Sequence, residues 1–121
     1  MEMCEEMYKL RSMLDARAIE WHDKSSIMSP QLIAENISAG IEKNYADVSI
    51  FRTHFEVHGE LWSVINGFST YGGYEPTTSK NMGLLELMSD MVNDGEPLGN
   101  LTADEVCKII DSGGDISWMN A

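Results

Sequence analysis

Positive charge is scarce in this chain, and so are cysteine and proline. The 121 residues hold eight Lys and Arg against twenty Asp and Glu, which gives a net charge of -12. A surface of that charge repels a phosphate backbone, so we expect no binding to duplex nucleic acid. The net charge does not exclude a small anionic ligand that binds in a locally neutral pocket. With 43% apolar residues, the chain has the composition of a folded domain.

The two cysteines, Cys4 and Cys107, stand near opposite ends of the chain and have no metal-type spacing. No His-x-x-x-His pattern accompanies them, so we expect no metal site and no cofactor. No apolar run approaches the roughly 18 residues of a membrane span. Acidic residues also occupy the place that a basic leader would take. These absences predict a cytoplasmic protein with free thiols and no membrane contact.

Catalytic patterns are also missing. The sequence has no nucleophile elbow and no phosphate-binding P-loop. His22, His54 and His58 form no cluster with cysteine, so we expect them to be solvated or paired polar residues. The sequence therefore predicts a protein that is not an enzyme.

Apolar residues at helical spacing predict helices over about 2–20, 30–45 and 83–92. A capping box, with Thr102 as the N-cap and Glu three residues later, predicts a last helix over about 103–112. The segment that begins at Ile19 could instead start a short strand. On the first helix, the side chains that lie partly off the inner face predict self-association; they are Tyr8 and Met13.

The clearest strand signal lies in the middle of the chain, where a hairpin is predicted over about 48–66. Apolar and polar residues alternate up to a tight His58-Gly59 turn, and an apolar run follows. A two-residue loop fixes the register and places Phe55 opposite Trp62. One face of the hairpin then carries Phe51, Phe55, Trp62 and Val64 toward the core. The other face carries Arg52, His54, Ser63 and Ile65.

These elements predict a single domain over 1–121 with an α+β fold, a small Greek-key-like antiparallel sheet decorated by helices. Residues 67–83 show no periodicity and predict a long loop, which is often functional in so small a domain. Hydroxyl, aromatic and glycine residues alternate in this loop: Phe68, Thr70, Tyr71, Gly72 and Gly73.

This loop is the candidate ligand site. Glycines let a backbone approach an anion, and the faces of Tyr71 and Phe68 can stack on a base. The amide of Asn81 suits a base edge. A turn rich in glycine and tyrosine can also be no more than a turn.

The negative charge avoids this part of the chain. From Val48 to Gly83 two cations, Arg52 and Lys80, stand against three anions, so this stretch carries -1 of the total of -12. The planar fork of Arg52 can pair two phosphate oxygens. The alternative is an ion pair with Glu56, two residues away on the same face of the hairpin.

Five segments come in a characteristic order: LDARAIEW at 14–21, RTHF at 52–55, WSVINGFSTYGG at 62–73, GLLE at 83–86 and LTADEV at 101–106. In them the chain resembles small phage proteins of the first Thoeris anti-defence family, over most of its length. Those proteins are sponges, which bind a cyclised ADP-ribose made by a host TIR-domain enzyme and do not cleave it. The host effector then stays inactive. The resemblance implies a cytoplasmic protein of the infected bacterial cell, with a sheet decorated by helices.

The resemblance also implies partners and residue roles. Similar members assemble as dimers and hexamers, and some hold cyclic oligonucleotides at separate sites. Tyr71 would stack on the adenine, and Asn81 would bind a base edge or the ribose. In the Arg52-Thr53 pair, Arg52 would meet the pyrophosphate. The residues that would shape the turn are Thr70, Gly72 and Gly73. The segment over about 25–47 is longer than the link expected in this family, which leaves the quaternary arrangement open.

Two other functions stay open at this point. An acidic inhibitor that mimics nucleic acid would bind a basic host protein with strong salt dependence, and a nucleotide-cleaving enzyme would turn the signal over. A sponge predicts neither, but it needs a Kd of about 10 nM, or about -11 kcal/mol. An open loop on a monomer does not enclose a nucleotide well enough for that. We therefore expect a homo-oligomer, either a dimer or a hexamer, in which a partner subunit closes the pocket.

Overall fold

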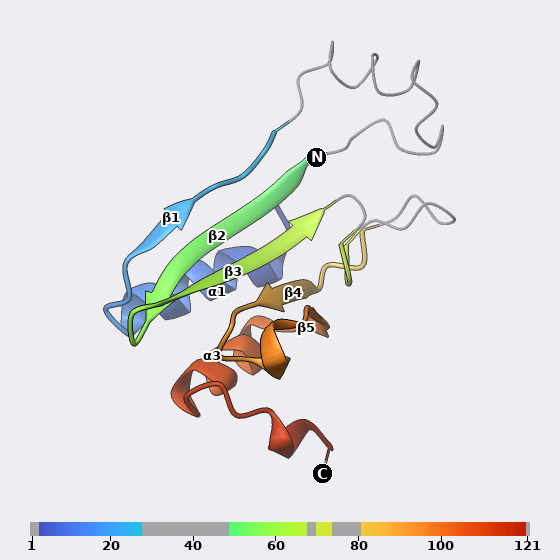
Figure 1. Cartoon of the computed structure of the whole chain (residues 1–121). Coiled ribbons are helices and arrows are strands. Elements are labelled where there is room, and N and C mark those ends of the chain that lie inside the picture. The colour runs from blue at the N-terminus through green and yellow to red at the C-terminus, as the bar shows by residue number, and fades with distance from the viewer. Residues whose placement is uncertain (1–2, 28–48, 68–69, 74–80, 121) are drawn as a thin grey trace.

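An antiparallel sheet of five strands and the helices α1 and α3 make up the described part of the fold (Figure 1). The computed structural model describes residues 3–27, 49–67, 70–73 and 81–120. The predicted helix over 30–45 and the ring of Phe68 lie outside these residues. In chain order, the elements are α1 (Glu5–Ala16), β1 (Trp21–Asp23), β2 (Ile50–Val57), β3 (Glu60–Gly67), β4 (Leu85–Met88), η1 (Asn93–Gly95), β5 (Leu98–Leu101), α3 (Ala103–Asp111) and η2 (Ser117–Asn120).

The strands lie in the sheet in their order along the chain, and each pairs antiparallel with the next. The sheet is therefore a meander, and the Greek-key-like arrangement predicted from the sequence is wrong. The predicted hairpin is confirmed as β2 and β3, with Phe55 opposite Trp62. His58 and Gly59 both have positive φ, as the tightest hairpin turns require.

The helix predicted over 83–92 is also wrong, because this segment contains the strand β4. Leu85 and Leu87 are fully buried, and β4 pairs with β3 on one side and β5 on the other. A short apolar run fits both a helix and a buried strand, and here the neighbouring strands decide the outcome. The first helix likewise ends at Ala16, and β1 begins at Trp21, so the strand alternative holds there.

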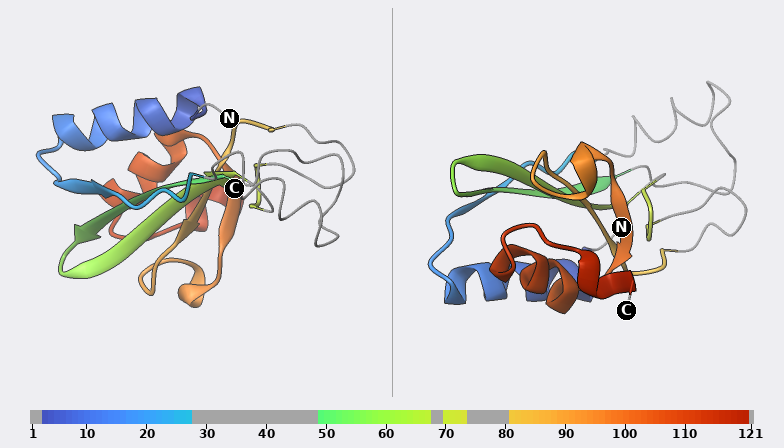
Figure 2. Two further views of the ribbon diagram at one scale, coloured as in Figure 1. Left: turned by 90° about the horizontal axis from the view of Figure 1, so that it is seen from above. Right: turned by 60° about the horizontal axis from the view of Figure 1, so that its bottom comes forward.

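Helices α1 and α3 cover the same face of the sheet (Figure 2). The capping box at the start of α3 is confirmed, since the Thr102 hydroxyl accepts from the Glu105 N–H and the Glu105 side chain accepts from the Thr102 N–H. The two helices are joined by the ion pairs Arg17–Asp111, at 2.8 Å, and Lys9–Asp104, at 2.7 Å. Between the helices and the sheet lies a core that includes Met7, Leu10, Leu14, Phe55, Trp62, Val64, Val106 and Ile109.

The opposite face of the sheet carries none of the described helices (Figure 2). We call it the open face. Arg52, His54 and Ile65 lie on it, half-buried, and Glu86 belongs to the same side of the sheet but is buried. Residues paired across neighbouring strands point to the same side of a sheet. The open face is therefore built of rows that run across the strands, and each row takes one residue from every strand that it crosses.

Candidate functional site

The turn around Tyr71 is fixed by its backbone against β4 and β5. The Tyr71 N–H donates to the Glu86 carboxylate at 3.1 Å. The Tyr71 carbonyl accepts from the Asn100 N–H at 3.2 Å, and the Gly72 carbonyl accepts from the Leu84 N–H at 3.0 Å. The Tyr71 side chain is nevertheless 62% exposed. An accessible ring on a fixed backbone is what a stacking surface for a base requires.

Glycines permit the close packing of this turn. A Cβ at Gly99 of β5 would collide with the Cβ of Tyr71, so only glycine lets the turn lie on β5. Gly72 has a φ of +102°, which side chains rarely adopt, and a Cβ there would lie 2.8 Å from the Cβ of Leu84. A Cβ at Gly73 would collide with the Gly67 carbonyl and the Thr70 hydroxyl.

Thr70 is buried and closes the same turn from inside. Its hydroxyl accepts from the Gly67 N–H at 3.0 Å and donates to the Gly67 carbonyl at 2.9 Å. Both bonds are internal to the turn. Thr70 therefore fixes the shape of the turn, and we expect the neighbouring residues to contact a ligand.

Asn81 is engaged in a reciprocal amide pair with Asn66. Its Nδ2 donates to the Asn66 Oδ1 at 2.8 Å, and its Oδ1 accepts from the Asn66 Nδ2 at 3.0 Å and from the Gly83 N–H at 2.8 Å. Asn66 is fully buried and also donates to the Leu84 carbonyl at 2.8 Å. The pair holds the start of β4 against the end of β3. Among the described residues, one N–H of the Asn81 amide is left for another partner.

Arg52 and Thr53 are successive residues of β2, so they point to opposite faces of the sheet. Arg52 is half-buried on the open face. Among the described residues, no carboxylate lies within ion-pair distance of its guanidinium, so the alternative pair with Glu56 does not form. Thr53 is fully buried beneath α1, where its hydroxyl accepts from the Arg11 Nε at 2.8 Å. Thr53 therefore does not lie on the open face of the sheet with Arg52.

One row of the open face joins Arg52 to the Tyr71 turn. Arg52 pairs with Ile65, and Ile65 pairs with Glu86, whose carboxylate holds Tyr71. Lys24 extends the row at the other end, where its N–H donates to the Arg52 carbonyl at 2.9 Å. Neighbouring strands lie about 4.8 Å apart, so the backbones at Arg52 and Glu86 are about 10 Å apart.

Lys24 and Glu86 also belong to this row, and neither was predicted from the sequence as a site residue. The helix predicted over 83–92 includes Glu86, but the alternation of leucine with Glu86 and Met88 is the pattern of a strand that turns its leucines toward the core. Lys24 follows a strand of only three residues, which is too short to give a periodic pattern.

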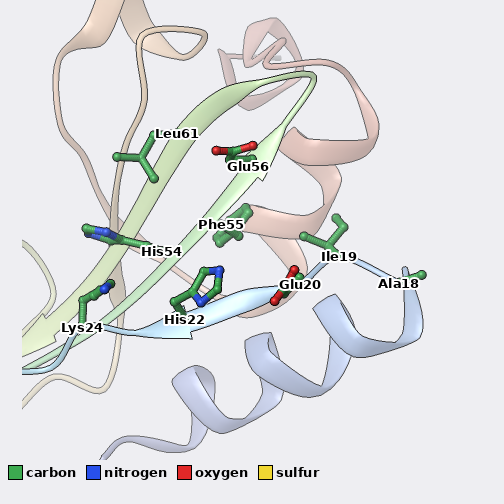
Figure 3. A pocket seen from close by; sticks show the side chains of 9 residues that line it. All are labelled: Ala18, Ile19, Glu20, His22, Lys24, His54, Phe55, Glu56 and Leu61. Atoms are coloured by element: carbon green, nitrogen blue, oxygen red, sulfur yellow. The ribbon is translucent and has the colours of Figure 1, made fainter.

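The next row of the open face contains His22 opposite His54. Both line a cavity of about 500 Å³, together with Lys24, Leu61 and other residues (Figure 3). Burial lowers the pKa of His54, and the charges of Arg52 and Lys24 lower it further. The lowered pKa of His54 therefore reflects its burial first and the nearby positive charges second.

Comparison of the chain with known protein families, curated proteins and solved structures finds no match. In the part of the chain that the structure describes, no three His, Cys, Asp or Glu residues are grouped so that they could hold a metal ion. None of the described helices is long and apolar enough to cross a membrane.

Proposed function

We propose that this chain binds a cyclic ADP-ribose-type nucleotide along the row from Arg52 to Tyr71 and sequesters it without cleaving it. The observation that carries the proposal is the hydrogen bond between the Tyr71 N–H and Glu86, because Glu86 stands in the same row as Arg52. The accessible ring of Tyr71 and the guanidinium of Arg52 would then contact the same ligand. Among the described residues, the guanidinium has no acidic partner. The backbones at Arg52 and Glu86 lie about 10 Å apart, and Tyr71 lies beyond Glu86, against β5. This order along the sheet suits a ligand with phosphates at one end and a base at the other.

Each position in the row has a chemical task in this proposal. Arg52 and Lys24 pair with the diphosphate, where a charged donor on a charged acceptor gives the stronger hydrogen bonds. The Tyr71 ring stacks on the base. The buried Glu86 carboxylate holds the Tyr71 N–H and so fixes the backbone that carries the ring. Ile65 lies between Arg52 and Glu86 as an apolar floor, and the remaining Asn81 N–H is available to the base edge.

The resemblance to the first Thoeris anti-defence family supplies the biological part of the proposal. In the cytoplasm of an infected bacterium, a phage-encoded sponge would lower the free concentration of the signal, so that the host effector stays inactive. Assembly as a homo-oligomer and a separate site for cyclic oligonucleotides belong to the same proposal.

The test is to incubate the purified protein with cyclic ADP-ribose isomers, remove unbound ligand by filtration, denature the retained protein by heat and chromatograph what is released. Intact nucleotide supports the sponge, and converted nucleotide would make the protein an enzyme. If nothing is retained, the proposal fails, and the next experiment is capture of a basic protein partner. Tyr71→Ala with Arg52→Gln should retain none. Lys9→Gln, which removes a positive charge on α1, is the matched control.

A further inference from the structure

His22 and His54 meet across the strands β1 and β2. They lie directly opposite one another in the antiparallel register, and both imidazoles line the cavity of about 500 Å³ on the open face (Figure 3). The sequence contains one further histidine, His58, which lies in the β2–β3 turn and lines a different cavity. Because residues 22 and 54 are far apart in the chain, no sequence spacing marks them as a pair.

The strand pairing places both imidazoles within reach of one ion. One row away, the Lys24 N–H donates to the Arg52 carbonyl at 2.9 Å, so backbone hydrogen bonds fix the pairing of β1 with β2 at this point. The Cβ atoms of directly opposite residues lie about 5 Å apart. Two nitrogen ligands that are each held at about 2.0–2.1 Å from one ion lie about 3 Å apart. Rotation of the two side chains about their χ angles therefore brings the rings to one ion without a change in the backbone.

The charges around the two histidines balance one another. Lys24 and Arg52 occupy the next row on one side, and the register continued in the other direction places Glu20 beside Glu56. Figure 3 shows both carboxylates and the Lys24 ammonium around the same cavity. Neither carboxylate forms an ion pair within the described part of the chain. Both are therefore available to compensate the charge of a bound ion, directly or through a water molecule.

The ligand type determines which ions suit the pair. Imidazole nitrogens bind Zn²⁺, Cu²⁺ and Ni²⁺, and the affinity of such a site is highest for Cu²⁺. Ca²⁺ and Mg²⁺ prefer oxygen ligands and are not expected here. Among the described residues, no third His, Cys, Asp or Glu joins the two histidines in a group that could hold a metal ion. The protein therefore supplies two ligands, and water completes the coordination.

We propose that His22 and His54 together bind one divalent ion of the first transition row, such as Zn²⁺, in the cavity of the open face. Structural zinc sites use four protein ligands, so an ion held by two stays open to water and to a further ligand. The ion also ties β1, an edge strand of three residues, to β2. The inference does not depend on the proposed function, because nucleotide takes no part in it.

Calorimetric titration of the full chain with Zn²⁺ tests the site. Excess Ca²⁺ in the buffer occupies surface carboxylates, and a Cys4→Ser background removes the accessible thiol, while Cys107 is buried. One ion per chain should bind. His22→Gln or His54→Gln should each weaken binding by about tenfold or more, since even an outer partner of a ligand is worth that much. His58→Asn removes the third histidine and is the matched control, with unchanged affinity.

Three outcomes of this titration would overturn the proposal. The first is the absence of Zn²⁺ binding when Ca²⁺ is in excess. The second is unchanged affinity in both His22→Gln and His54→Gln, which would place the ion on other ligands. The third is an equal loss of affinity in His58→Asn, which would show that single histidines bind the ion independently.

Amide hydrogen exchange gives a second readout that keeps both histidines in place. The Lys24 N–H belongs to the ladder between β1 and β2, where it donates to the Arg52 carbonyl. Bound Zn²⁺ should slow its exchange, because an ion that joins the two strands opposes their local opening. The Gly95 N–H, in the connection between β4 and β5, is the control and should exchange at the same rate. Equal exchange of the Lys24 N–H with and without Zn²⁺ would contradict an ion shared by His22 and His54.

Discussion

The backbone N–H of Tyr71 donates a hydrogen bond of 3.1 Å to the carboxylate of Glu86. This bond connects the turn of the predicted ligand loop to a strand of the sheet. Because Glu86 shares a row with Ile65 and Arg52, it also relates the aromatic ring to the guanidinium. A turn that is already ordered loses less conformational entropy when a ligand binds, so the fixed backbone favours affinity.

Replacing the Tyr71 ring should remove the stacking surface and leave the fold intact. Tyr71→Ala should weaken nucleotide binding by about 1–3 kcal/mol, the range for stacking of one base. Tyr71→Phe keeps a ring and should bind nearly as wild type. Isothermal titration calorimetry gives the affinities, and circular dichroism checks the fold. Equal binding by wild type and Tyr71→Ala would rule out this ring as the platform.

Removing the guanidinium of Arg52 should weaken binding by about 1.5–3 kcal/mol, the scale of a hydrogen bond to a charged group. Arg52→Lys keeps the charge but loses the planar fork, so it should recover only part of the affinity. Lys24→Gln should show a smaller loss in the same titration. If Arg52→Gln binds with the wild-type affinity, the phosphates do not lie on this row.

The amide pair of Asn66 and Asn81 should contribute to stability as well as to the site. Asn66→Ala leaves the Asn81 amide without its reciprocal partner, so it should lower the free energy of unfolding by about 1–3 kcal/mol in urea denaturation. Asn81→Ala should destabilise by a similar amount.

Asn66→Ala and Asn81→Ala differ in the ligand contact that each of them removes. Asn66 is fully buried, whereas Asn81 keeps one N–H that can reach a base edge. At temperatures where both are folded, Asn81→Ala should therefore lose more affinity than Asn66→Ala. Equal losses would mean that Asn81 only positions the chain.

Acidification should destabilise the protein through His54. Burial, followed by the charges of Arg52 and Lys24, lowers the pKa of His54 below its ordinary value of 6.5. The unfolded chain then takes up this proton at a higher pH than the folded chain. The free energy of unfolding therefore falls as the pH drops below about 6.5, until folded His54 is protonated too.

Urea denaturation over this pH range measures the effect. His54→Gln should flatten the pH dependence, and His58→Asn, in the exposed turn, should leave it as in wild type. A His54→Gln profile that falls as steeply as that of wild type would show that other groups cause the loss.

The parts of the fold that the sequence predicted are those fixed by local chemistry. The period-two pattern and the two-residue turn of the hairpin determine its register, and the capping box determines the start of α3. The strand β4 was missed because its short leucine run has no local preference, and pairing with β3, some twenty residues earlier, decides its structure.

The candidate site was predicted in part for the same reason. The accessible ring of Tyr71 and the outward position of Arg52 follow from composition and alternation. The same alternation places Thr53 toward the core, against the role that its pairing with Arg52 suggested. The Asn66–Asn81 pair and the bond from Tyr71 to Glu86 each join residues fifteen positions apart. No local sequence pattern predicts either contact.

The most direct test of the account is a titration of the ¹⁵N-labelled protein with cyclic ADP-ribose isomers, followed by the backbone amide resonances. Binding along the row should shift the amides of Arg52, Ile65, Glu86 and Gly72. The amides of the β2–β3 turn and of α3 should stay in place. Two results would contradict a nucleotide site between Arg52 and Tyr71. One is a set of shifts confined to the β2–β3 turn or to α3, and the other is the absence of shifts at saturating nucleotide.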